Sequence, residues 1–266
     1  MRRITMLGNE QNLLAVFGTY LDAVMKHTLV TRIMRADYFL QMIQSERNYL
    51  PRVLKWQDVY ECYVVRLKIH NCKVRHLLRN FYGQCWSFRK SESELLWNAR
   101  DANVGKNKHD VVMIESSVYD LVKSIQDIEF VPGHAQGVVR VASVDYNLCE
   151  KISEGQIALD LSSDANMMDT LFMKRAQFGD EKELRLMFNI HGRLFHKYLD
   201  YKIDKGILSY PLKNKTLIRS VLCHPLMGKQ RVRQIERAIN KSSWRIPNVR
   251  QSDLYDLPKT EFHMFD

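Results

Sequence analysis

Three charged side chains stand at alternate positions in the segment FGDEKELRLMF, which runs from Phe178 to Phe188. Leucines and a phenylalanine alternate there with polar residues, which is the pattern of a half-buried β-strand. Side chains two apart on a strand share a face, so Glu181, Glu183 and Arg185 are expected to line up, with the carboxylates about 6.5 Å apart. Two such carboxylates can act as an acid/base pair. The alternative is a solvated face with an ion pair that contributes little stability.

The chain lacks the motifs of several common enzyme classes. It has no HExxH pair, no GxSxG turn and no GxxxxGK[ST] loop. Its five cysteines include no CxxC pair, which disfavours both a disulfide framework and a structural zinc site. We therefore predict no metal ion. Cys85, beside Trp86, is an alternative nucleophile, and a buried apolar cysteine is its commoner role.

Polar residues on other predicted strands are candidates to work with the carboxylates. Arg32 lies in LVTRIM and Ser87 in CWSF. Arginine binds a phosphate or carboxylate through two parallel hydrogen bonds. A fixed glutamate can stabilise positive charge that develops on a sugar, and a second carboxylate can take a proton from the attacking group. The alternative for Arg32 is a structural ion pair with Asp58 or Glu61.

The elements that would position these residues alternate between strands and helices without a regular βαβ rhythm. No glycine-rich phosphate loop follows any predicted strand, so we predict an α+β fold with mixed or antiparallel central sheets and flanking helices. Residues 1–28 are predicted to form an N-terminal helical extension, and 29–266 a single domain. Strands are predicted in 29–34, 85–88, 110–116, 137–146, 182–190 and 215–225, and helices in 10–27, 36–47, 64–82, 91–102, 118–126, 167–177 and 228–241.

Positive charge is concentrated in two blocks of a chain whose net charge is +10. Residues 211–250 hold ten basic residues against the single acid Glu236, and 62–90 hold seven basic residues and no acid. Such blocks indicate a polyanionic partner, and the alternative is a generally basic surface. The predicted nucleic-acid contacts are Lys229, Arg231, Arg233 and Arg237 in the later block and Lys73 and Arg75 in the earlier one.

The sequence also indicates a cellular compartment. No apolar run reaches the roughly 20 residues that cross a bilayer, and the N-terminus lacks the apolar core of a secretory signal. Scattered cysteines are typical of a reducing environment. We therefore expect a cytoplasmic protein without membrane contact.

Four segments occur in a fixed order between Thr31 and Pro258: TRIMRADYFLQMIQSERNYLPRVLKWQDVYE, YGQCWSFRKSESELLW, KRAQFGDEKELR and LIRSVLCHP. In this order they resemble the signatures of a widespread bacterial family of unknown function. The chain departs from that family in two places. The sequence DVYE stands at 58–61 where the family has DPfE, and Arg100 stands where the family has a tyrosine.

That family in turn resembles the ADP-ribosyltransferase superfamily, and the resemblance implies an ADP-ribosyltransferase-like fold with NAD as substrate. It implies that Arg32 holds the NAD and that Glu183 is the catalytic glutamate, which binds the nicotinamide ribose. Glu181, two residues earlier, would orient or deprotonate the acceptor. These roles come from the resemblance and not from the spacing.

The same resemblance implies Ser87 as the residue that supports the nicotinamide half, with Trp86 or Tyr82 as a stacking surface. It further implies a toxin of a toxin–antitoxin or anti-phage defence system, with an antitoxin or chaperone as partner. Because the basic blocks exceed what one NAD needs, the expected acceptor is a nucleic acid, RNA rather than DNA. The alternatives are a non-catalytic nucleic-acid-binding or regulatory module and a metal-independent nuclease.

Overall fold

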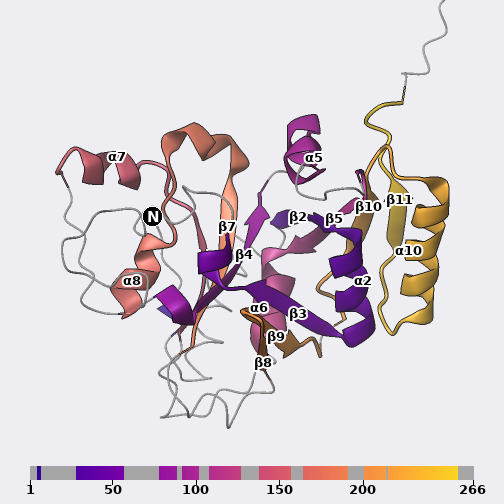
Figure 1. Ribbon diagram of the computed structural model, residues 1–266, viewed down its shortest axis with the longest axis horizontal. Helices are drawn as coiled ribbons and strands as arrows, with labels where there is room; N and C mark the ends of the chain where they lie inside the picture. The colour runs from indigo at the N-terminus through magenta and orange to yellow at the C-terminus, as the bar shows by residue number, and fades with distance from the viewer. Residues whose placement is uncertain are drawn as a thin grey trace, which may run out of the picture.

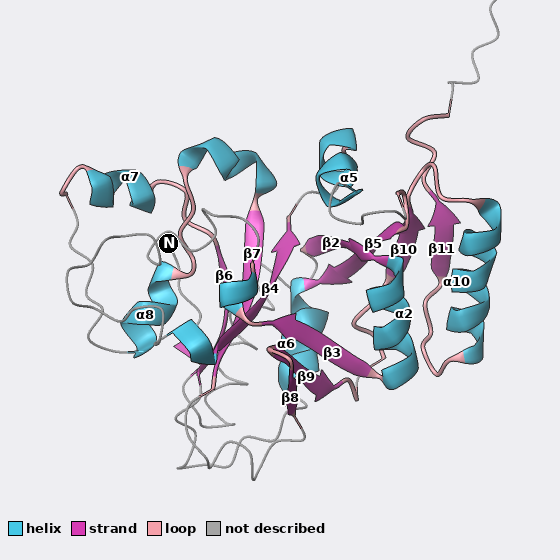
Figure 2. Ribbon diagram, viewed as in Figure 1, coloured by secondary structure: helices cyan, strands magenta, loops and turns pink. Residues whose placement is uncertain are grey.

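Eight strands form the main sheet in the computed structural model of the chain (Figures 1 and 2). The structure describes residues 5–6, 28–56, 78–88, 92–101, 108–126, 138–156, 164–190, 201–213 and 215–256. Neighbouring strands pair antiparallel except for the last two, which are parallel. The strand order is β1 (Thr5–Met6), β6 (Val138–Ser143), β7 (Glu183–Asn189), β4 (Phe81–Ser87), β2 (Leu29–Arg35), β5 (Val111–Ser117), β10 (Ser220–Cys223) and β11 (Asn248–Gln251).

A second, three-stranded sheet has the order β3 (Arg47–Pro51), β9 (Ile207–Pro211) and β8 (Lys202–Asp204), all antiparallel. The predicted α+β class with mixed sheets and flanking helices is therefore confirmed. The described helices are α2 (Ala36–Ser45), α5 (Glu94–Asp101), α6 (Val118–Gln126), α7 (Leu148–Ser153), α8 (Asp164–Thr170) and α10 (Lys229–Lys241), with short 3-10 helices η2 (Val53–Lys55), η3 (Leu78–Asn80) and η4 (Ala176–Glu181).

The two faces of the main sheet bury different cores, and β7 separates them. Its even-numbered residues Leu184, Leu186 and Phe188 belong to the larger core, which also contains residues of α2, α10 and the second sheet. Met187, on the opposite face, packs in a smaller core with residues from α8 and η3. All seven residues of β7 are buried, so the prediction of a half-buried strand is wrong. Both faces of this strand are covered.

The sequence predicted six of the main-sheet strands and four of the helices. β2, β4, β5, β6, β7 and β10 lie within or across the predicted strands, and α2, α5, α6 and α10 coincide with predicted helices. The helix predicted over 167–177 is wrong, because α8 ends at Thr170 and a separate 3-10 helix follows. The helix predicted over 64–82 is wrong at its end, since β4 begins at Phe81, and the rest of it largely falls outside the described residues.

The N-terminal segment contributes to the main sheet. Thr5 and Met6 pair with Arg140 and Val139 of β6 as an edge strand. The helix predicted in 10–27 lies outside the described residues. In the described part of the chain, no helix is both long and apolar enough to span a membrane.

Candidate functional site

Glu183 begins β7, and Glu181 stands just before it at the end of η4. Lys182, between them, has a left-handed backbone with φ 46°. Because this residue turns the chain out of the 3-10 helix and into the strand, Glu181 does not extend the strand face. The prediction that both glutamates line up on one strand face is therefore wrong, whereas Glu183 and Arg185 do share a face.

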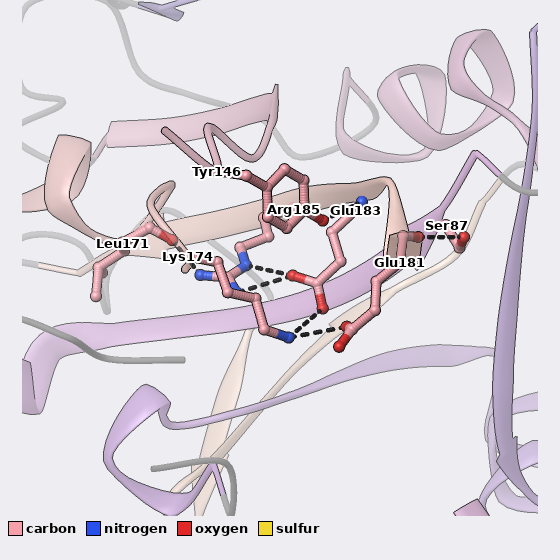
Figure 3. A network of polar contacts seen from close by, with 7 residues as sticks. All are labelled: Ser87, Tyr146, Leu171, Lys174, Glu181, Glu183 and Arg185. Atoms are coloured by element: carbon pink, nitrogen blue, oxygen red, sulfur yellow. Dashed lines mark hydrogen bonds and ion pairs between the residues drawn. The ribbon is translucent and has the colours of Figure 1, made fainter. Parts of the chain in front are cut away.

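Lys174 joins the two carboxylates despite this turn (Figure 3). Its Nζ lies 2.8 Å from Oε2 of Glu181 and 3.2 Å from Oε1 of Glu183. The side chains of Lys174 and Glu183 are 1% and 6% exposed, whereas that of Glu181 is 34% exposed. The carboxylates thus form a pair with one inner member and one member that reaches solvent.

Arg185 holds the inner carboxylate from its other side. Its Nε and Nη2 both donate to Oε2 of Glu183, at 3.0 and 2.8 Å. Its Nη1 donates to the carbonyl of Leu171 at 2.6 Å, and its guanidinium lies 5.2 Å from the ring of Trp56. A fully buried arginine is tolerated only when its charge is compensated. Glu183 supplies that compensation.

Two further residues fix the backbone around the pair (Figure 3). The backbone N–H of Glu183 donates to the hydroxyl of Tyr146 at 2.8 Å, and Ser87 Oγ donates to the carbonyl of Glu181 at 2.6 Å. Burial raises the pKa of Tyr146 to about 12, so its hydroxyl stays protonated at neutral pH.

The environment drives the pKa values of the two glutamates apart. Burial raises the pKa of Glu181 to about 7, and a hydrogen bond with Glu183 adds to the rise while Lys174 opposes it. Burial would also raise the pKa of Glu183, but the charges of Arg185 and Lys174 and hydrogen bonds from Glu181 and Arg185 lower it to about 2. Near neutral pH the inner carboxylate is ionised while the outer one exchanges a proton. Such separation is typical of acid/base pairs in active sites.

The strand register places Ser87 beside Glu183 and does not place Arg32 there. Ser87 pairs directly with Glu183 on one side and with Thr31 on the other. Direct cross-strand neighbours share a face, and the next residue along a strand faces the opposite way. Thr31, Ser87 and Glu183 therefore form one row, and Arg32 points to the other face. There its charge acts on Tyr210 of β9, opposing the rise in pKa that burial causes in Tyr210.

Trp86 and Tyr82 also lie on the face away from Glu183, within the larger core. Each is 2% exposed. The indole Nε1 of Trp86 donates to Oε1 of Gln84 at 3.3 Å, and the hydroxyl of Tyr82 accepts from Arg52 at 3.0 Å. As placed here, neither ring offers a face to a nicotinamide beside Glu183. The predicted stacking role is thus not supported by their positions.

The basic residues of α10 divide into two groups. Arg231 is engaged with two carboxylates, at 2.8 Å from Oδ1 of Asp110 and 2.5 Å from Oδ1 of Asp37. Lys229, Arg233 and Arg237 are exposed on the helix surface. Lys73, Arg75 and the alternative partners Asp58 and Glu61 lie outside the described residues.

Sequence reasoning missed Lys174 and Tyr146, which complete the site. Lys174 lies in KRAQFGDEKELR, in a stretch predicted as helix, and no spacing rule relates it to Glu183. The one usable signal was a lysine that directly follows the apolar run LFM, because a lysine that is buried together with such a run needs an acidic partner. Among the described residues, no group of three or more His, Cys, Asp or Glu is arranged to hold a metal.

Comparisons with known proteins add a distant structural similarity. No protein-family model and no curated protein matches the chain. DarT of Thermus sp. 2.9 in complex with NAD+ aligns at 9% identity and a TM-score of 0.38, covering 85% of this chain and 95% of that one. Its complex with ADP-ribosylated ssDNA aligns at 10% identity with the same coverage and a TM-score of 0.38, and its carba-NAD+ complex at 10% and 0.36. Similarity at this level assigns neither a family nor an activity.

Proposed function

We propose that the chain is an NAD-dependent ADP-ribosyltransferase that modifies a nucleic acid, RNA in preference to DNA. The observation that carries the proposal is the pair of carboxylates bridged by Lys174, whose pKa values are about 2 for Glu183 and about 7 for Glu181. The sequence resemblance to ADP-ribosyltransferases points to the same two residues.

In this proposal the reaction breaks one bond to the ribose C1 and forms another. The bond between the ribose C1 and the nicotinamide nitrogen breaks, and nicotinamide leaves with the electron pair. Glu183, ionised, stabilises the positive charge that develops on the ribose and accepts a hydrogen bond from a ribose hydroxyl. The acceptor atom then bonds to C1, and its proton passes to the ionised form of Glu181.

The number of free hydrogen-bond acceptor positions on Glu183 decides whether it can bind a ribose hydroxyl. A carboxylate has about four acceptor positions. Arg185 uses two on Oε2 and Lys174 one on Oε1. Once Glu181 is ionised it no longer donates to Glu183, and a position on Oε1 is available. The proposal therefore assigns the ribose contact to Oε1.

The residues around this centre take more limited roles. Ser87, next to Glu183 in the register, borders the nicotinamide half. Arg32, Trp86 and Tyr82 lie on the other sheet face and receive no NAD contact. Lys229, Arg233 and Arg237 are proposed to bind acceptor phosphates, and Arg231 is left out because Asp110 and Asp37 already hold it. A role as a toxin with a neutralising partner protein rests on the sequence resemblance alone.

The test is nicotinamide release from NAD, measured with RNA, with single-stranded DNA and with no nucleic acid. The wild-type chain is expected to release nicotinamide fastest with RNA. Glu183→Gln keeps the shape of the side chain but removes its charge, and is expected to reduce the rate by about 10²–10³-fold. Full activity in Glu183→Gln, or no release from the wild type under any condition, would show that the proposal is wrong.

A second candidate function is favoured by the burial of Glu183, which is only 5% exposed. Both of its carboxylate oxygens already accept hydrogen bonds within the protein. In that case the cluster is structural and the protein is a non-catalytic nucleic-acid-binding module. It would bind RNA in a salt-sensitive manner, unaffected by Glu183→Gln, and consume no NAD. Cleavage of the RNA during the same incubation would indicate a nuclease instead.

A further inference from the structure

We propose that Lys174 is a positioning residue for the transfer reaction: its ammonium group holds the carboxylates of Glu181 and Glu183 together, so that Glu181 is kept beside the reacting centre. This inference rests on the proposed function for its kinetic consequence but on geometry for its basis. No motif in the sequence assigns any role to Lys174.

Lys174 donates hydrogen bonds to both carboxylates (Figure 3). Arg185 donates twice to Oε2 of Glu183, whereas the cation that lowers the pKa of Glu181 is Lys174. The inner carboxylate thus receives two cations and the outer carboxylate one. Because this asymmetry favours ionisation of Glu183, the shared proton resides on Glu181.

The backbone around Lys174 is fixed, which is what a positioning role requires. Its N–H donates to the carbonyl of Asp145 at 3.1 Å, and the N–H of Asp145 donates to the carbonyl of Phe172 at 2.8 Å. Its Nζ also lies 4.8 Å from the ring of Phe178. The same turn supplies Tyr146, whose hydroxyl accepts from the N–H of Glu183. The turn at Asp145 and Tyr146 therefore holds the backbone of both Lys174 and Glu183.

The charged and titratable groups around Glu181 come from three segments. Lys174 comes from the segment before η4, Glu183 and Arg185 from β7, and Tyr146 from the turn before α7. Tyr146 stays neutral, so Lys174 is the cation that directly opposes the rise in the pKa of Glu181 that burial causes. Removing its charge is expected to raise that pKa further.

The kinetic experiment is the pH profile of kcat/KM for nicotinamide release. In the wild type the rate is expected to increase as Glu181 ionises, with a midpoint near its pKa of about 7. Lys174→Gln is expected to move this midpoint upward by about one pH unit, and Lys174→Arg to restore it. Lys151→Gln, at an exposed lysine of α7, is the matched control and leaves the midpoint in place.

A purely structural role predicts a different result. Lys174→Gln would then lower the melting temperature and the rate but leave the midpoint of the pH profile unchanged, and this outcome would overturn the proposal. If Lys174→Gln does not fold, Lys174→Met provides the same loss of charge with a side chain suited to burial. The same upward shift is expected for it, and an unchanged midpoint has the same meaning.

A second readout separates this inference from the proposed function. In protein labelled with ¹³C at glutamate side chains, the carboxyl signal of Glu181 is identified by its loss in Glu181→Gln. Its titration midpoint is expected to rise in Lys174→Gln or Lys174→Met, whether or not NAD is consumed. If NAD is not consumed but the midpoint shifts, the function is wrong and the role of Lys174 stands. If the midpoint does not shift, the role of Lys174 is wrong.

Discussion

Among single residues, Arg185 decides which glutamate stays ionised. It is fully buried and places two N–H groups on one oxygen of Glu183. Lys174 serves both glutamates, so it does not by itself distinguish them. The result is a carboxylate that remains charged next to a carboxyl that titrates near neutral pH. Stabilising the ribose cation requires a carboxylate that stays ionised, whereas removing the acceptor proton requires a carboxylate that can take up a proton near neutral pH.

The raised pKa of Glu181 makes stability depend on pH in a specific direction. Its folded pKa of about 7 lies above the unfolded value of 4.5, so between these pH values the folded chain keeps a proton that the unfolded chain has released. Its contribution to stability is therefore present below pH 4.5 and is lost as the pH rises through 7. Glu183, whose pKa is lowered, contributes in the opposite sense, and that contribution is lost as the pH falls from 4.5 towards 2.

We predict that Glu181→Gln removes the loss of stability that the ionisation of Glu181 causes above pH 4.5. Between pH 5 and pH 8 the wild type is expected to lose about 1–2 kcal/mol more of its free energy of unfolding than the variant. The full shift would correspond to roughly 3 kcal/mol, and we discount it because a third of the side chain is in contact with solvent. Urea denaturation at the two pH values measures the difference. Equal losses in both proteins would contradict the raised pKa.

Among elements, the close approach of β4 and β7 sets the position of Glu183. At Gly83 an added Cβ would lie 2.3 Å from Sδ of Met187 and 2.9 Å from Cζ2 of Trp56. Trp56 in turn contacts Arg185. A side chain at this position would therefore push against the support of the carboxylate pair.

Gly83→Ala is accordingly expected to lower the free energy of unfolding by about 1–3 kcal/mol, as overpacking does in a filled core. Residue 83 is four positions from Ser87, which lies at the site end of β4. We nevertheless expect Gly83→Ala to reduce nicotinamide release, because Trp56 contacts Arg185. Gly228→Ala is the control, because no atom of the described residues lies within 4 Å of a Cβ there. Thermal unfolding and the rate assay on both variants measure the effects. Equal stability of the two would refute the tight packing.

The arginines of α10 are expected to behave differently from one another. Arg231 connects α10 to Asp37 of α2 and to Asp110 before β5. Arg231→Gln is therefore predicted to cost about 1–3 kcal/mol of stability. Arg233→Gln, two residues further along the helix, is exposed and should change stability by less than about 0.5 kcal/mol while weakening RNA binding. Denaturation and fluorescence anisotropy distinguish the two, and a stability loss that is larger for Arg233→Gln would reverse the assignment.

Local patterns predicted the elements that have a single buried face. The helix α10 buries Val232, Ile235 and Ile239 at helical spacing, and its limits were predicted to within one residue. The strands β3, β8 and β9 were missed, because β8 has three exposed residues and β3 follows a left-handed turn at Glu46 that no simple alternation reveals. The turn between η4 and β7 was also not predicted, because Lys182 adopts a positive φ that lysine seldom adopts.

For the molecule as a whole, the candidate site depends on how the strands pair and on how the chain before β7 folds against that strand. That Glu183 and Arg185 share a face follows from their spacing. Arg32 points to the sheet face opposite Glu183 because Thr31, and not Arg32, pairs with Ser87. A shift of the register by one residue would place Arg32 on the same face as Glu183. The contact of Lys174 with both glutamates depends on how the chain from 171 to 181 folds back over β7. Neither property is encoded in a local pattern.

The distribution of charge predicts how binding responds to salt. Replacing Lys229, Arg233 and Arg237 together by Gln removes three exposed cations of α10. If all three contact phosphates of single-stranded RNA, the slope of log K against log salt should decrease by about 0.7 for each, roughly 2 in total. Anisotropy titrations at several salt concentrations give the slope for each protein. An unchanged slope would place the acceptor on another surface.

The measurement that tests the central claim most directly is mass spectrometry of RNA after incubation with NAD and the protein. We predict that the wild type increases the mass of the RNA by one ADP-ribosyl group and releases one nicotinamide for each group added. Glu183→Gln should abolish both signals at protein concentrations where it still binds the RNA. Unmodified RNA and intact NAD after incubation with folded, RNA-binding wild-type protein would contradict the claim.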